Sequence, residues 1–262
     1  MGLALGSGGI RGLAHVGVIR TLLRHNIPID YIAGSSIGAW VGAHYALYKD
    51  FDRLNEFTIG KKQEKFRSFL ELSLKGGGFI KGEKMELMFD EWLEHKTFAD
   101  VQIPFKCNSA DLLSGGEVVF ESGPLAHAVR VSMSIPGMFR PVHERGMVLV
   151  DGGICNPVPD DIVRRMGADV VIAVNLDDFH ADGRYQEADM GLTNVANRSI
   201  EVMRHFLALN SIRNSDILIV PSVAKYSNWK EYFWNDAGEA IAKVGEEATE
   251  KVIPALKFIL EN

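Results

Sequence analysis

The sequence predicts an α/β fold with a mainly parallel central sheet flanked by helices. Short apolar runs alternate with segments of helical periodicity, and glycine-rich turns at 6–12 and 34–38 join them. The chain has 262 residues, of which 47% are hydrophobic and 24% charged, enough to build one large core. We therefore expect a single domain over residues 1–262, with a core at about 3–178 and a helical tail at about 190–262 that adds one strand.

Composition and charge limit the class of protein. A formal net charge of −6 argues against a nucleic-acid partner, which would require a basic face. The cysteines, Cys107 and Cys155, are far apart and lack metal-ligand spacing, so we expect reduced thiols and no metal site. The first residues have no leader pattern, and the apolar runs are shorter than a membrane span. These features favour a cytoplasmic protein with at most peripheral membrane contact, and they leave the oligomeric state open.

The first glycine-rich turn predicts an anion-binding loop. An apolar run at 3–5 precedes Gly6-Ser7-Gly8-Gly9-Ile10-Arg11-Gly12, and a helical pattern follows from Leu13. Backbone N–H groups at such a helix end bind a phosphate or an oxyanion. The lysine and hydroxyl of a nucleotide-binding P-loop are absent, and the glycine spacing does not fit a dinucleotide site. An oxyanion hole fits better, and a plain tight turn is the alternative.

The second turn has the pattern of a nucleophile elbow. The apolar run at 31–33 leads into Gly34-Ser35-Ser36-Ile37-Gly38, and a helix-periodic apolar segment follows. Glycine is needed on both sides because side chains there would collide with the neighbouring strand and helix. We therefore expect Ser36 to stand exposed at the end of a strand as a nucleophile, and a glycine-rich turn without chemistry is the alternative.

A third signal follows the strand expected at 147–150, where Asp151-Gly152-Gly153 stands. Asp-Gly is also a common turn, but this aspartate, the first glycine loop and the elbow are all expected at the carboxyl ends of strands, the edge where α/β sites form. A Ser-Asp-His triad would need His180 or His205 as its third member. Neither histidine has a strand-to-loop context, so a direct Ser-Asp dyad is the better interpretation.

The remaining patterns predict further elements. Helices are expected at about 50–75, 82–94 and 124–133, a hairpin at 105–121, and a turn-rich segment at 134–142. The basic cluster at 61–67 would suit an anionic membrane surface, although a solvated helix face is the commoner explanation. The polar loop at 177–189 would be a mobile segment near the site. In a later helix, Val195, Val202 and Phe206 lie on an apolar face opposite Arg204. The aromatic cluster at 229–234 would rim an acyl pocket, enter a membrane interface or simply pack.

The ordered motifs resemble those of the patatin-like phospholipase family. The resemblance rests on four segments in sequence order: Gly8-Gly9-Ile10-Arg11-Gly12, Gly34-Ser35-Ser36-Ile37-Gly38, Ser134-Ile135-Pro136 and Asp151-Gly152-Gly153. It implies a Ser36–Asp151 dyad on a parallel-sheet core, with backbone N–H groups at Gly8, Gly9 and their neighbours, up to Ile10 and Arg11, as the oxyanion hole. It also implies that Arg11 orients that loop. Ser7 departs from the family pattern, since many members have glycine there.

The function expected from these features is that of a serine acyl hydrolase cleaving the carboxylic esters of phospholipids or lysophospholipids through an acyl-enzyme. No cofactor is expected. An acyltransferase using the same dyad, and a lipid-binding or regulatory protein with little catalysis, are the alternatives. The four motifs together favour an enzyme, because a binding module has no physical need for a strained serine opposite an aspartate.

Overall fold

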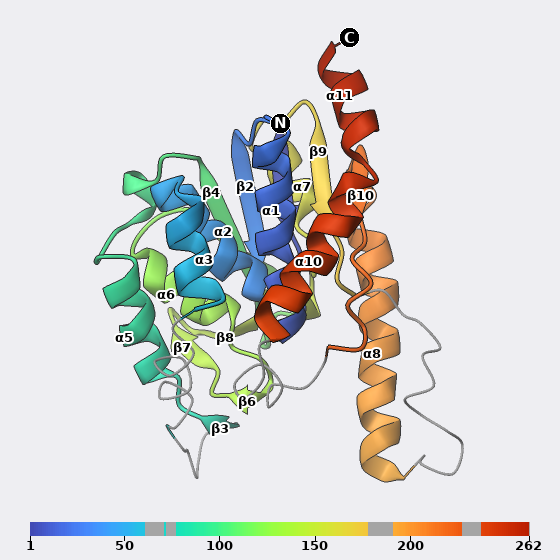
Figure 1. Cartoon of the computed structure of the whole chain (residues 1–262). Coiled ribbons are helices and arrows are strands. Elements are labelled where there is room, and N and C mark those ends of the chain that lie inside the picture. The colour runs from blue at the N-terminus through green and yellow to red at the C-terminus, as the bar shows by residue number, and fades with distance from the viewer. Residues whose placement is uncertain (61–70, 72–76, 178–190, 227–236, 262) are drawn as a thin grey trace.

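A computed structural model describes residues 1–60, 71, 77–177, 191–226 and 237–261 of the chain (Figure 1). The basic cluster at 61–67, the aromatic cluster at 229–234 and the polar loop from residue 178 onward lie outside the described residues. Among the described helices, none is both long enough and apolar enough to cross a bilayer.

The core of the described structure is an eight-stranded sheet. Its order is β10-β9-β1-β2-β4-β8-β7, and β5 also pairs with β4. The pairs from β10 to β4 are parallel, and those of β4 with β8, β7 with β8 and β4 with β5 are antiparallel. The strands are β1 (Gly2–Leu5), β2 (Tyr31–Ser35), β4 (Phe105–Asp111), β5 (Glu117–Phe120), β7 (Val142–Glu144), β8 (Met147–Asp151), β9 (Val171–Val174) and β10 (Ile217–Ile219). The expected mainly parallel α/β sheet is confirmed.

Helices cover the sheet (Figure 1). They are α1 (Ala14–Arg24), α2 (Ile37–Tyr48), α3 (Phe51–Thr58), α5 (Glu83–Trp92), α6 (Leu125–Ser132), α7 (Asp160–Arg165), α8 (Leu192–Ser211), α10 (Ala237–Glu250) and α11 (Ile253–Glu261). Short 3-10 turns lie at Gly9–Leu13, at the end of the first glycine-rich turn, and at Gly152–Ile154, directly after β8. The C-terminal region is helical, as expected, and its strand β10 extends the sheet beside β9.

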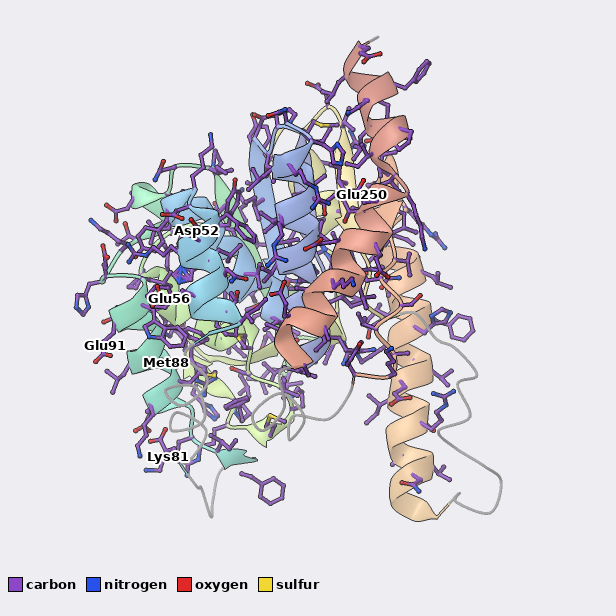
Figure 2. All side chains as sticks on the ribbon, viewed as in Figure 1. Asp52, Glu56, Lys81, Met88, Glu91 and Glu250 are labelled. Atoms are coloured by element: carbon purple, nitrogen blue, oxygen red, sulfur yellow. The ribbon has the colours of Figure 1, made fainter. Side chains whose placement is uncertain are left out.

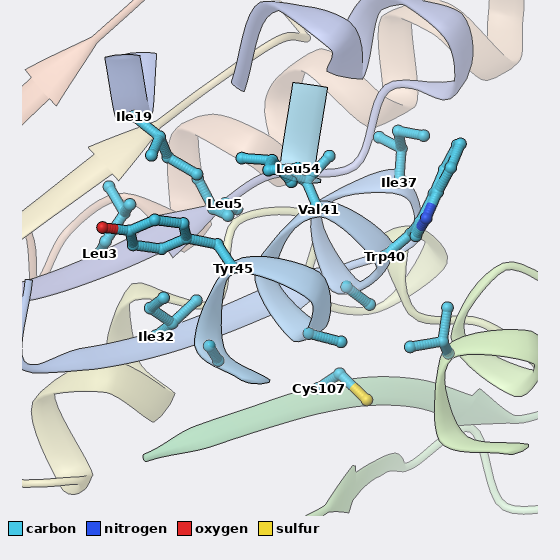
Figure 3. Packing of buried hydrophobic residues seen from close by; sticks show 14 of the residues in the cluster. Leu3, Leu5, Ile19, Ile32, Ile37, Trp40, Val41, Tyr45, Leu54 and Cys107 are labelled. Carbon is cyan, nitrogen blue, oxygen red and sulfur yellow. The ribbon is translucent and has the colours of Figure 1, made fainter. Parts of the chain in front are cut away.

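The two faces of the sheet differ in side-chain size. Alternate residues of a strand point to opposite faces, so Leu3 and Leu5 pack into the larger apolar cluster with α1 and α2, whereas Ala4 packs with α7. The neighbouring strand repeats this pattern, with Ile32 on the first face and Ala33 on the second. Figure 3 shows the first face, where α2 lies over the sheet. Small residues on the second face let α7 approach closely.

Three features differ from the sequence-based expectations. The strand ending at Asp151 runs antiparallel to β4, whereas a mainly parallel sheet was expected. The turn-rich segment at 134–142 contains β6 (Gly137–Phe139) and the start of β7. β6 pairs with β3 (Gly78–Ile80), a strand that the sequence analysis did not predict. A strand pattern carries no information on direction, and three-residue strands are too short to show alternation.

Helix α8 presents the opposite face from the one expected. Val195 is 46% exposed and Phe206 65%, whereas Ala208 is buried and Arg204 makes partly buried polar contacts. The expectation that the apolar face of this helix packs inward is wrong, because Arg204 on the opposite face contacts Ser7 and Asp177.

Helix α10 packs against α1 through small residues. A Cβ atom on Gly17 would overlap the carbonyl group of Ala242, and one on Gly245 would overlap that of Ala14. Around this close contact, Arg20 donates to Glu246, and Arg24 pairs with Glu250, which Figure 2 labels on α10. The C-terminal helix is thus fixed against the helix that follows the first glycine loop.

This packing predicts that Gly17→Ala destabilises the fold. The added methyl group would push α10 away from α1, and overpacking of this kind costs about 1 to 3 kcal/mol. Thermal unfolding should show a midpoint several degrees lower. Gly191→Ala is the matched control, because Gly191 has φ −73° and open space around it. Equal midpoints for both variants would contradict the close contact.

Candidate active site

Ser36 has a strained backbone between β2 and α2. Its φ of 56° and ψ of −122° lie outside the regions that L-residues ordinarily adopt. Its N–H donates to Ser132 Oγ at 2.9 Å, which fixes the turn from the side of α6. The predicted strand, turn and helix are all present around Ser36. The expected exposure is wrong, because Ser36 is only 2% exposed and its hydroxyl lies against the buried Asp151 carboxylate.

The glycines on either side of Ser36 allow close approach of the backbone. A Cβ atom on Gly34 would overlap the Gly38 carbonyl, and one on Gly38 would overlap the carbonyl of Leu5 at the end of β1. The first turn of α2 therefore rests directly on the carboxyl ends of β1 and β2. Gly34 and Gly38 have the spatial role that the elbow pattern predicted.

Ser36 and Asp151 are in direct contact. Ser36 Oγ donates to Asp151 Oδ2 at 2.5 Å, across 115 positions of sequence. Asp151 reaches Ser36 because β8 enters the sheet from the opposite direction: Asp151 pairs with Ser109, and Asn108 pairs with Ser35. The antiparallel strand thus ends at the level where the elbow begins.

The Asp151 carboxylate is buried and held at both oxygens. Oδ1 accepts from the Gly153 N–H at 2.8 Å, and the backbone N–H of Asp151 donates to Ser134 O at 3.0 Å. Burial raises the pKa of Asp151 to about 6, while the hydrogen bonds from Ser36 and Gly153 oppose the shift. At neutral pH the carboxylate is therefore mostly ionised and a stronger base than an exposed aspartate.

The first glycine loop lies beside this pair. In the described part of the chain, the backbone N–H groups of Gly8 and Gly9 have no hydrogen-bond partner. Gly9 has φ 57°, and a Cβ atom on Gly8 would touch the Leu176 side chain, so the loop requires small residues at both positions. Two such N–H groups can bind a developing oxyanion.

Tight contacts join the three loops. A Cβ atom on Gly12 would overlap the Ile37 side chain, next to Ser36. One on Gly153 would lie 2.6 Å from Ser7 Oγ and 3.0 Å from Asp151 Oδ1, and one on Gly152 would overlap the Asn108 side chain. The elbow, the first glycine loop and the Asp151-Gly152-Gly153 turn therefore meet at one place.

Arg11 and Ile10 support the loop in different ways. Arg11 Nε donates to Gly8 O at 3.1 Å, and Arg11 Nη2 donates to Asp177 Oδ1 at 2.9 Å. The Ile10 side chain is buried in the main apolar cluster. These contacts concern the side chains, and the assignment of the Ile10 and Arg11 N–H groups to an oxyanion hole stays a prediction.

Histidine takes no part in the Ser36–Asp151 contact among the described residues. His205 Nδ1 lies 2.9 Å from Asp177 O, and His15 Nε2 lies 2.7 Å from Gly6 O. Burial lowers the pKa of His15 to about 4 and that of His44 to about 3, so both are neutral. His44 packs among Tyr48 and Phe57. His180 lies outside the described residues.

Sequence reasoning missed four side chains that contact the site loops. Ser132 holds the Ser36 N–H, Asp177 holds Arg11, and Arg204 Nη2 donates to both Asp177 Oδ2 and Ser7 Oγ. Ser7 itself was noted only as a departure from the family pattern. The position of Asp177 just after β9, at the carboxyl edge, was the one available signal; nothing local marks the others.

Comparisons with known proteins identify the family. The profile of the family described as Patatin-like phospholipase matches residues 3–163. An uncharacterized NTE family protein of Mycobacterium tuberculosis (strain H37Rv) is 38% identical over 194 residues, 73% of this chain and 52% of that protein. Lysophospholipase nte1 of Aspergillus fumigatus is 34% identical over 209 residues, 76% of this chain and 13% of that protein.

The chain thus spans about half the length of its mycobacterial relatives and a smaller part of the fungal one. The crystal structure of VipD from Legionella pneumophila shares the fold, with a TM-score of 0.56 and 14% identity over 97% of this chain and 66% of that one. Since the family profile covers more than half of the chain, this protein belongs to the patatin-like phospholipase family.

Proposed function

We propose that this protein is a serine acyl hydrolase that cleaves carboxylic ester bonds of phospholipids or lysophospholipids. The hydrogen bond between Ser36 Oγ and the buried Asp151 carboxylate carries the proposal. The N–H groups of Gly8 and Gly9, which have no partner in the part of the chain that the structure describes, support it because they suit a tetrahedral oxyanion. The family and the name lysophospholipase of its fungal relative support a lipid ester as substrate.

The reaction takes two steps. Asp151 accepts the Ser36 proton as Oγ attacks the ester carbonyl carbon, and the N–H groups of Gly8 and Gly9 bind the resulting oxyanion. The ester C–O bond then breaks, and the leaving alcohol takes the proton from Asp151. Water next attacks the acyl group on Ser36 and gives a proton to Asp151, and that proton returns to Ser36 as the fatty acid leaves.

Substitution of either dyad residue should abolish hydrolysis. Ser36→Ala removes the nucleophile, and Asp151→Asn removes the base, a loss of about 10² to 10⁴ in kcat. Short and long acyl esters, with and without phospholipid vesicles, would be tested together with labelling by a fluorophosphonate. Asp52→Asn, an exposed carboxylate of α3 labelled in Figure 2, is the control and should keep wild-type rates.

Retention of wild-type hydrolysis by Ser36→Ala would overturn the dyad. If wild type and variants were equally inert on every ester, a binding or regulatory role would replace the proposal. Fluorophosphonate labelling of Ser36 in a wild-type protein that hydrolyses none of the esters would indicate an acyl acceptor other than water.

The pH dependence of hydrolysis should follow the ionisation of the Asp151 carboxylate. Because burial raises its pKa to about 6, the fraction of ionised base falls as pH drops through 6, and kcat/KM should fall about tenfold per pH unit below that value. The rate of fluorophosphonate labelling between pH 4.5 and 8.5 measures this on the free enzyme. A rate that stays flat down to pH 5 would contradict Asp151 as the base.

The same raised pKa predicts that Asp151→Asn stabilises the fold at high pH. A carboxyl whose pKa rises from 3.8 to about 6 on folding binds its proton more tightly in the folded state, so folding free energy is lost as pH rises from about 4 to 6. Above this range the cost is about 3 kcal/mol. Thermal unfolding at pH 8 should show a midpoint several degrees higher for Asp151→Asn, with no gain at pH 4. An equal or lower midpoint at pH 8 would contradict the burial cost.

A further inference from the structure

Two arginines bind one buried carboxylate beneath the first glycine loop. Asp177 is 7% exposed; its Oδ1 accepts from Arg11 Nη2 and its Oδ2 from Arg204 Nη2, each at 2.9 Å. A single carboxylate balances only one guanidinium. The cluster therefore holds one positive charge in excess, close to Asp151.

Each arginine also holds the first glycine loop. Arg11 Nε donates to Gly8 O at 3.1 Å, and Arg204 Nη2 donates to Ser7 Oγ at 3.2 Å. Helix α8 is fixed further by the next residue, since His205 Nδ1 lies 2.9 Å from Asp177 O. The loop is thus held from two sides, by Arg11 within the same segment and by Arg204 from a helix 197 residues away.

Ser7 connects Arg204 to the dyad. Its hydroxyl lies against Gly153, whose N–H donates to Asp151 Oδ1 at 2.8 Å. Ser7 N–H donates to Pro157 O at 2.8 Å, so the residue is fixed at its backbone and, through Arg204, at its side chain. A displaced Ser7 would move the neighbouring Gly8 and Gly9 N–H groups relative to Ser36.

We propose that Arg204 is a positioning residue that holds the Ser7–Gly9 segment in register with the Ser36–Asp151 pair and keeps a positive charge beside it. This inference rests on the proposed hydrolase function. It assigns a role to α8, which lies beyond the segment that matches the family profile. The Arg204 Nε is buried and has no hydrogen-bond partner among the described residues.

The charges around Asp151 give the proposal a distinct signature. Arg204 favours the ionised carboxylate and lowers the pKa of Asp151, whereas Asp177 raises it. Glu201, on the same helix, acts on both arginines, and the nearby Cys155 thiol stays neutral because burial raises its pKa to about 12. Loss of Arg204 would leave Asp177 opposed only by Arg11, and the pKa of Asp151 would rise.

The test compares Arg204→Gln, Arg204→Lys and the control Arg213→Gln, an exposed arginine two residues after α8. For Arg204→Gln we expect kcat to fall tenfold to a hundredfold, with KM within about twofold of the wild-type value. We also expect the acid limb, the fall of kcat/KM at low pH, to move to higher pH. Arg204→Lys should restore the acid limb but only part of kcat, because the lysine ammonium lies one bond closer to the backbone than Arg204 Nη2, the atom that donates to both Ser7 and Asp177. Arg213→Gln should match the wild type.

Fluorophosphonate labelling of wild type and Ser36→Ala separates this inference from the function itself. Wild-type protein that is not labelled overturns the proposed function. Labelled, active wild type together with an Arg204→Gln variant of unchanged kcat and acid limb overturns the role of Arg204 alone, as would equal losses in Arg204→Gln and Arg213→Gln. If Arg204→Gln does not fold, Ser7→Ala keeps both ion pairs and should lower kcat threefold to tenfold; an unchanged kcat would then overturn the positioning role.

Discussion

The close approach of α2 to the ends of β1 and β2 is the constraint on which the rest of the site depends. It is possible only because Gly34 and Gly38 lack side chains, and it forces Ser36 into a positive φ. Such a conformation costs about 1 to 3 kcal/mol. Burial of a single large apolar side chain contributes about 1.5 to 3 kcal/mol, and α2 buries several, among them Tyr45, Val41 and Ile37 (Figure 3). The core therefore outweighs the strain and holds Ser36 in place.

Asp151 lies at the same edge of the sheet, but the strand that carries it reaches this edge from the opposite direction. Parallel strands can bring only their carboxyl ends to this edge, and β1 and β2 do so. β8 instead reaches it by running beside the last residues of β4 in the opposite direction. Ser134 and Gly153 then fix the backbone and the carboxylate of Asp151. A mixed sheet thus allows the Ser36 hydroxyl and the Asp151 carboxylate to contact each other directly, without an intervening histidine among the described residues.

The sequence was sufficient for features with local signals and insufficient for those that depend on tertiary contact. The elbow around Ser36 and the hairpin of β4 and β5 were predictable because glycine spacing and alternation are local. The direction of β8 was not, since a strand pattern is the same read either way. The orientation of α8 was misread because Arg204 lies opposite the apolar face of the helix, and its partners Ser7 and Asp177 lie 197 and 27 residues away.

The charge balance of the site agrees with the proposed reaction. With Asp151 ionised, two buried carboxylates, Asp151 and Asp177, face two guanidiniums, Arg11 and Arg204, and the four charges cancel. When Asp151 takes the Ser36 proton, the negative charge moves to the carbonyl oxygen of the substrate. The remaining three groups then carry one net positive charge beside the glycine loop that we propose binds this oxygen. The cluster would therefore stabilise the charge where it develops in the transition state, and fixed dipoles and charges of this kind need no reorganisation during the reaction.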